Sequence, residues 1–205
     1  MNKLFLKASI VGLSICSSVA HGSLITSDID TALNGAVIET FNSVTEGYYS
    51  SLSLPGVTIV GSGSDMRVYT DSNSSNYGRS GAALQNYGGS PSSFDLIFDT
   101  EVSAFGIWGG AYNNAWTFSA YDSLDNLIES VSVSTTCCTS QFYGLENSGM
   151  SKVTLSGFGD WVVFDDLTFV SQTNTDPNTV SEPAILALLG IGLAGVGFTR
   201  KKKSA

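Results

Sequence analysis

The strongest constraint on the fold is an alternation of apolar and polar residues that dominates residues 36–170. Within residues 94–99, for example, Phe94, Leu96 and Phe98 fall on one face of an extended chain. Helical periodicity of any length is absent from this part of the sequence. The pattern therefore predicts an all-β domain.

Turn-forming residues separate the alternating runs at intervals of roughly 8 to 14 residues, which is typical of an antiparallel β-sandwich of the jelly-roll kind. One hairpin is well marked between Ala120 and Leu127, where Asp, Ser and Asn follow one another. The predicted strands cover residues 37–41, 56–60, 66–70, 94–99, 102–108, 116–120, 127–133, 151–155 and 161–170.

Charge is distributed very unevenly along the chain. Of its nine basic residues only Arg67, Arg79 and Lys152 lie between the two ends, whereas 17 of the 18 acidic residues lie there, so the middle carries a net charge of −14. A field of that sign repels phosphate backbones and anionic lipid. Nucleic acid is therefore not expected as a partner, whereas divalent cations and neutral sugars are.

The first 22 residues have the three-part layout of a secretory signal peptide: Lys3 and Lys7, an apolar stretch, then small residues. Two cleavage points satisfy the requirement for small residues, one after Ala20 and one after Gly22, and the sequence does not separate them. We assign residues 1–22 to the signal and residues 23–170 to the β-sandwich domain.

The C-terminal end follows a polar linker at residues 171–180. Residues 184–199 form an uncharged run of 16 residues, long enough for a short transmembrane helix of about 24 Å. The basic cluster after it would stay cytoplasmic, which places the acidic domain outside. Flanking this run are Ser181, Glu182 and Pro183 before it and Arg200, Lys201, Lys202 and Lys203 after it.

This order of linker, Glu-Pro, short Gly- and Ala-rich apolar run and basic cluster resembles the PEP-CTERM sorting signal of Gram-negative bacteria that produce exopolysaccharide. The name-giving Pro-Glu-Pro of that family has Ser181 in place of its first proline here. The resemblance covers residues 181–205. It implies export across the inner membrane, transient anchoring by the apolar helix, cleavage near Glu182 by a membrane-embedded exosortase, and transfer to the cell surface or its surroundings.

Several kinds of catalysis are excluded by composition. His21 is the only histidine and lies at the end of the signal, so a Ser-His-Asp or Cys-His site and a His-ligated zinc site are not expected. Cys137 and Cys138 are adjacent and provide no ordinary disulfide framework. Among so many carboxylates, some pair would have the separation of the two catalytic carboxylates of a glycosidase by chance alone, so such a pair is not evidence of catalysis. We therefore expect a protein that is not an enzyme.

Calcium is the cofactor that this composition suits best, because it is bound by oxygen ligands alone. Asp165 and Asp166 interrupt an otherwise apolar strand, and a buried carboxylate must be paired or coordinated. With Glu39 from an early strand they form a candidate structural calcium site. The alternative is that one carboxylate faces solvent while the other caps a loop.

Sugar stacking is the other candidate function, and six aromatic residues could provide it. Core packing is the expected role of Trp116 and Trp161, which lie in alternating strands. Tyr112, followed by Asn113 and Asn114 in a glycine-flanked loop, is the preferred ligand-binding candidate, since an aromatic ring with amide groups suits a neutral glycan. The six aromatic residues are Tyr48, Tyr49, Trp108, Tyr112, Trp116 and Tyr143.

Together these features predict an exported, exosortase-sorted protein of the cell surface or extracellular matrix that associates with exopolysaccharide through a non-catalytic β-sandwich. A structural or adhesive biofilm-matrix protein that contacts other proteins without binding a glycan is the alternative.

Overall fold

The computed structural model describes residues 22–70, 81–86, 90–111, 115–136 and 139–172. These residues form twelve antiparallel strands and one short 3-10 helix, so the predicted all-β class is confirmed. None of the helical structure described is long and apolar enough to cross a membrane. The transmembrane helix predicted at residues 184–199 and the signal peptide predicted at residues 1–22 lie outside the described residues, apart from Gly22.

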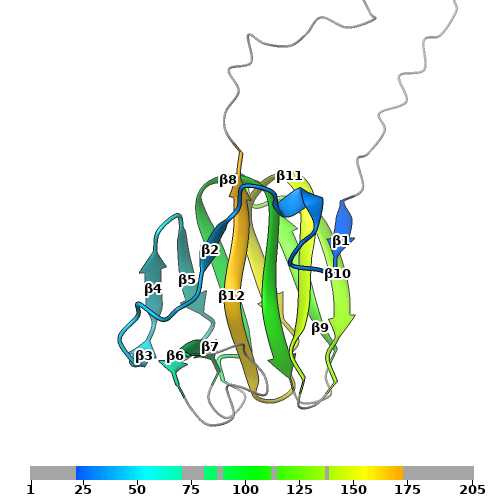
Figure 1. Ribbon diagram of the computed structural model, residues 1–205. Coiled ribbons are helices and arrows are strands. Elements are labelled where there is room, and N and C mark those ends of the chain that lie inside the picture. The colour runs from blue at the N-terminus through cyan, green and yellow to red at the C-terminus, as the bar shows by residue number, and fades with distance from the viewer. Residues whose placement is uncertain (1–21, 71–80, 87–89, 112–114, 137–138, 173–205) are drawn as a thin grey trace, which may run out of the picture. The chain divides into compact units, whose positions relative to one another are not determined.

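The elements follow one another along the chain as labelled in Figure 1. They are β1 (Ser23–Ile25), η1 (Thr31–Leu33), β2 (Val37–Glu39), β3 (Gly47–Tyr49), β4 (Ser51–Leu54), β5 (Val57–Gly61), β6 (Met66–Tyr69), β7 (Ala83–Gln85), β8 (Ser93–Ala111), β9 (Ala115–Tyr121), β10 (Leu127–Ser134), β11 (Gln141–Ser156) and β12 (Val162–Ser171).

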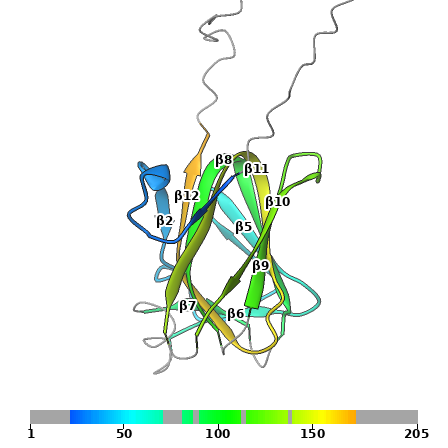
Figure 2. The ribbon, with the colours of Figure 1, turned by 90° about the vertical axis from the view of Figure 1, so that its right-hand side faces the viewer.

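Two long strands, β8 and β11, pair along almost their whole length and take part in both layers of a sandwich. Residues 93–98 of β8 lie between β5 and the second half of β11. The second half of β11 also pairs with β9, and β9 pairs with β10. After a shift of register near Met150, residues 102–111 of β8 lie between the first half of β11 and β12. The bent ribbon thus carries the chain from one layer to the other (Figures 1 and 2).

The second layer continues from β12 in two directions. Residues near Leu167 pair with β2, whereas Val163 and Phe164 pair with β7, which is followed by β6 and β3. On the other side, β1 pairs with the first half of β11. Strand β3 is therefore an edge strand of the second layer among the described residues.

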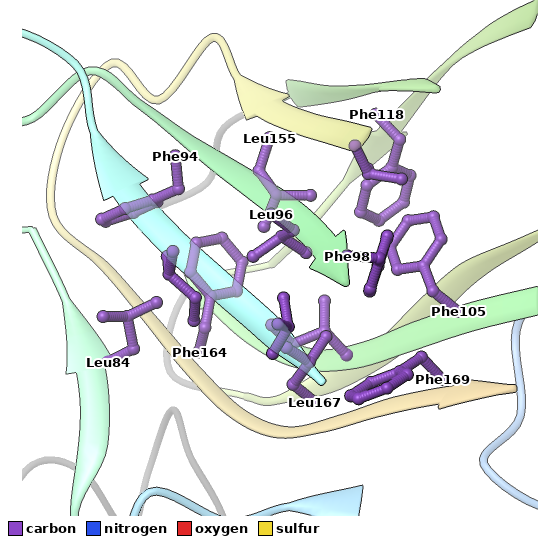
Figure 3. Close-up of a cluster of buried hydrophobic side chains, with 14 of the residues drawn as sticks. Leu84, Phe94, Leu96, Phe98, Phe105, Phe118, Leu155, Phe164, Leu167 and Phe169 are labelled. Atoms are coloured by element: carbon purple, nitrogen blue, oxygen red, sulfur yellow. The ribbon is translucent and has the colours of Figure 1, made fainter. Parts of the chain in front are cut away.

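Aromatic side chains from the two layers meet in the core (Figure 3). The ring centroids of Phe94 and Phe164 lie 5.8 Å apart, and those of Phe98 and Phe169 lie 5.4 Å apart. In each pair the first residue belongs to the first layer and the second to β12. The alternation along residues 94–99 therefore has its expected physical cause, which is burial of one face of each strand against the opposite layer.

A close approach of backbones between β8 and β11 requires glycine. Gly144 is the Cα partner of Gly106, and a Cβ on Gly144 would collide with the carbonyl oxygen of Phe105 and lie 2.7 Å from the Cα of Gly106. A Cβ on Gly106 would collide with the ring of Phe142. Gly106 thus leaves room for the Phe142 ring, and Gly144 lets the two backbones approach closely.

The predicted hairpin is confirmed, and Asp122 organises its turn. One oxygen of its carboxylate accepts hydrogen bonds from the backbone N–H groups of Leu124 and Asn126, both at 2.8 Å, and the other accepts from Asn126 Nδ2 at 2.9 Å. These bonds, led by the one from the Asn126 side chain, lower the pKa of Asp122 from its ordinary value of 3.8. Asp125 adopts a φ of 61°, in the left-handed region that short polar residues tolerate.

Most alternating runs became strands, but several strands carry no such signal. The runs at 94–99 and 102–108 are the two halves of β8, and the run at 151–155 is the second half of β11. The strands β1, β3, β4 and β7 and the first half of β11 were not predicted. Trp161, for which core packing was predicted, precedes β12 and is partly buried against a small hydrophobic cluster of Ala83 and Val163.

Candidate functional site

Two exposed tyrosines flank an arginine at the β3–β6 edge of the second layer. Tyr48 is the Cα partner of Arg67, and Tyr69 follows Arg67 by two positions on β6, so all three side chains leave the sheet on the same face. Tyr48 is 62% exposed and Tyr69 is 40% exposed. With Glu46 and Gly47 these residues line a cleft of about 400 Å³, which we call the tyrosine cleft.

Arg67 is held in place by a buried amide. Its Nε and Nη2 atoms donate hydrogen bonds to Gln85 Oε1 at 3.2 and 2.7 Å. Gln85, which is fully buried, donates from Nε2 to the carbonyl oxygen of Tyr69 at 3.1 Å. The guanidinium carbon of Arg67 lies 4.7 Å from the centroid of the Tyr69 ring. These contacts fix the orientation of both the guanidinium and the ring before any ligand arrives.

Glu46 supplies the acidic rim of the tyrosine cleft. Its Oε1 accepts a hydrogen bond from the backbone N–H of Thr70 at 2.9 Å, which ties the end of β6 to the segment before β3. The cleft thus combines exposed aromatic rings with groups that can donate and accept hydrogen bonds. This combination can bind a ring-shaped ligand that carries hydroxyl groups and an apolar face.

A second cleft, of about 390 Å³, lies where β1 meets β8 and β11, and it unites two of the aromatic candidates. Trp108 contacts Phe142 edge to face, with ring centroids 5.6 Å apart, and Tyr143 lies next to Phe142 on the cleft wall. Tyr143 Oη donates to the carbonyl oxygen of Ser134 at 2.8 Å. Trp108 is partly buried, so this cleft presents less aromatic surface than the tyrosine cleft.

A third cleft, of about 510 Å³, is lined by acidic residues from the bend of β8 and from the β9–β10 turn. Lys152 Nζ lies 2.6 Å from Asp125 Oδ1, and this hydrogen bond is the main reason that the pKa of Lys152 is raised. The ammonium also lies 4.6 Å from the centroid of the Tyr121 ring. Across the described residues, no group of three or more His, Cys, Asp or Glu side chains is arranged to hold a metal ion.

The three residues of the predicted calcium site lie on neighbouring strands. Glu39 is the Cα partner of Leu167, one residue beyond Asp166, and its Oε1 accepts from the backbone N–H of Phe41 at 3.1 Å. Asp165 is buried, and its Oδ1 accepts from the N–H of Asp166 at 2.8 Å. Asp166 has a φ of 46° at a bulge in β12. Calcium at these carboxylates remains a prediction.

That prediction has a direct test in thermal unfolding. If Glu39, Asp165 and Asp166 bind calcium only in the folded protein, added calcium should raise the melting temperature above that of chelator-treated protein, because a ligand bound by the native state stabilises it. Equal melting temperatures for calcium-loaded and chelated protein would contradict the prediction. Magnesium at the same concentration is the control for ionic strength.

The remaining aromatic candidates have different positions. Trp116 is 2% exposed and packs in the main core, as predicted, and Tyr49 is partly buried against that core. Tyr48 has the exposure that stacking requires.

The sequence did not predict three of the site residues, which are Arg67, Tyr69 and Gln85, since their juxtaposition depends on the β6–β7 register. Several candidates lie outside the described residues: Tyr112, Asn113, Asn114, Cys137, Cys138, Ser181, Glu182, Pro183, Arg200, Lys201, Lys202 and Lys203.

The chain is similar to several solved structures. One is TmCBM61 in complex with beta-1,4-galactotriose, at 20% identity and a TM-score of 0.41, covering 59% of this chain and 97% of that one. Another is the K1 cleaved adhesin domain of Lys-gingipain from Porphyromonas gingivalis W83, at 11% identity and a TM-score of 0.42, covering 66% and 98%. A third is the arabinose-bound MgGH51 α-L-arabinofuranosidase, at 14% identity and a TM-score of 0.42, covering 67% and 26%.

Comparison of the sequence with known families gives a result for the C-terminal end. No curated protein matches the chain. A family model does match, over a segment that includes Ser181, Glu182 and Pro183 and most of the basic cluster. The match supports an exported protein that is sorted by an exosortase. The chain carries a PEP-CTERM protein-sorting motif at residues 179–202.

Proposed function

We propose that this protein is delivered by an exosortase-type protease to the cell surface or extracellular matrix, where its β-sandwich binds a neutral exopolysaccharide without catalysing a reaction. The sorting motif at residues 179–202 supports the route. The observation that carries the binding function is the tyrosine cleft, in which Tyr48 and Tyr69 are exposed beside Arg67.

Stacking of a sugar ring on an exposed tyrosine buries apolar C–H groups against the aromatic face, while the phenol hydroxyl remains available for hydrogen bonding. Arg67 and Glu46 add a donor and an acceptor beside the rings. Their orientation is set in advance by Gln85 and by the N–H of Thr70, which lowers the entropic cost of binding.

A neutral polymer is favoured over an anionic one by the charge of the domain. The part of the chain between its two ends has a net charge of −14, which repels a polyanion at moderate ionic strength.

Binding without catalysis is favoured by the composition of the tyrosine cleft. Glu46 is the one carboxylate among the described residues that line it, whereas most glycosidases act with a pair.

Glycan-array binding tests the proposed function. The protein should bind one or a few neutral polysaccharides saturably, and the reducing-end content of those polysaccharides should stay constant during incubation. An array without any signal would contradict glycan binding and favour a structural or adhesive matrix protein that contacts other proteins. A rise in reducing ends would contradict the non-catalytic function.

A further inference from the structure

A crevice between β10 and β11 holds Gly22, the residue before β1. A Cβ on Gly22 would collide with Glu129 Oε2 and would lie 2.6 Å from the carbonyl oxygen of Glu146 and 2.8 Å from Asn147 Nδ2. Two of these groups are joined to each other, since Asn147 Nδ2 donates to Glu129 Oε2 at 3.0 Å. Gly22 therefore packs over a hydrogen bond that links β10 to β11, and a side chain would fit there only if the backbone carbonyl of Glu146 also moved.

This position makes Gly22 part of the folded domain. Ser23, the next residue, is the Cα partner of Glu146 and begins β1, a strand of three residues. After removal of the signal, such a short strand close to the new chain terminus frays unless it is tied down. Gly22 extends β1 into contact with β10, which belongs to the other layer of the sandwich.

The small-residue rule for signal removal allows two cleavage points, and Gly22 is the last residue removed in one of them. The tight packing of Gly22 already requires a glycine at this position. Its small size is therefore no evidence that the enzyme that removes the signal cleaves after Gly22. Ala20, with Ser18 two residues before it, then satisfies the rule for the other point.

We propose that signal removal hydrolyses the Ala20–His21 bond, so that the mature protein begins at His21 and keeps Gly22 in its crevice. Water is the co-reactant. As the peptide bond breaks, Ala20 receives the hydroxyl of the water and becomes a C-terminal carboxylate, and His21 becomes the new N-terminal residue with a free α-amino group. The proposal rests on the export part of the proposed function.

Amino-terminal sequencing of the full-length protein recovered from outside the inner membrane tests it. The expected sequence begins His21, Gly22, Ser23. A sequence that begins with Ser23 and Leu24 would overturn the proposal while leaving export intact. A sequence that begins with Met1 would overturn export and cleavage together, so the two failures are distinguishable.

The variant Gly22→Ala tests the packing separately. Alanine is also small, so both cleavage points remain allowed, and the mature protein should still begin at His21. Because the new methyl group has no space, the melting temperature should fall by at least about 3 °C. Gly47→Ala is the matched control, since the nearest atom to its Cβ lies 3.8 Å away. An unchanged melting temperature for Gly22→Ala would show that the crevice does not require glycine and would overturn the proposal.

Discussion

Replacing Phe164 with alanine should remove a large part of the stability of the β-sandwich. Phe164 is 1% exposed, and its ring contacts the rings of Phe94, Trp116 and Phe158, with centroids 5.8, 5.2 and 5.5 Å away. The substitution leaves a cavity among rigid rings that cannot collapse, so we expect a loss of about 3–5 kcal/mol. Domains of this size are stable by only about 5–15 kcal/mol.

Denaturant unfolding followed by tryptophan fluorescence measures this loss. The control is Leu124→Ala, because Leu124 is 80% exposed in the β9–β10 turn and its truncation should change the free energy of unfolding by less than about 0.5 kcal/mol. If both variants unfolded at the same denaturant concentration, the two layers would not meet through Phe164 and the described core would be wrong.

Loss of the two tyrosine rings should have the largest effect on function. With a polysaccharide that the wild-type protein binds, Tyr48→Ala and Tyr69→Ala should each weaken binding at least about tenfold, or about 1.4 kcal/mol. Tyr69→Ala also removes the ring under the guanidinium of Arg67, so part of its effect comes from a less well-ordered donor. The double variant should show no measurable binding.

A matched control is available on the other layer. Tyr121 lies under Lys152 at 4.6 Å, much as Tyr69 lies under Arg67 at 4.7 Å, but it belongs to β9 and lies away from the tyrosine cleft. Tyr121→Ala should bind the polysaccharide as the wild type does. If all three single variants weakened binding equally, or if none did, the tyrosine cleft would not be the binding site. Melting curves of the variants establish that each remains folded.

Strand length explains part of what could be predicted of the fold. The run at 94–99 alternates clearly, and the run at 161–170 is a long, mostly apolar stretch. The first lies in β8, and all of the second except Trp161 lies in β12. β3 and β7 have three residues each, so their sequences hold too little periodicity to identify them. Such strands form because a neighbouring strand pairs with them, which is a tertiary effect.

The site was less predictable than the fold for a related reason. Tyr48 could be named as a stacking candidate from its residue type, since an aromatic ring in a polar segment is a local signal. The contact of Arg67 with Gln85 joins residues 18 positions apart, and it is created by the pairing of β6 with β7. Similarly, Glu39 lies opposite Leu167, the residue after Asp166, only because β2 pairs with β12. Register of this kind is decided by packing that a single sequence does not reveal.

The central claim is that the acidic β-sandwich reaches the cell surface by way of its sorting motif, and the intact mass of surface-released protein tests this most directly. The sorting motif covers residues 179–202 and includes the predicted cleavage region at Ser181, Glu182 and Pro183. The account predicts a mass that lacks residues 184–205. Recovery outside the cell of a protein that retains Arg200 and the lysines after it would contradict the account.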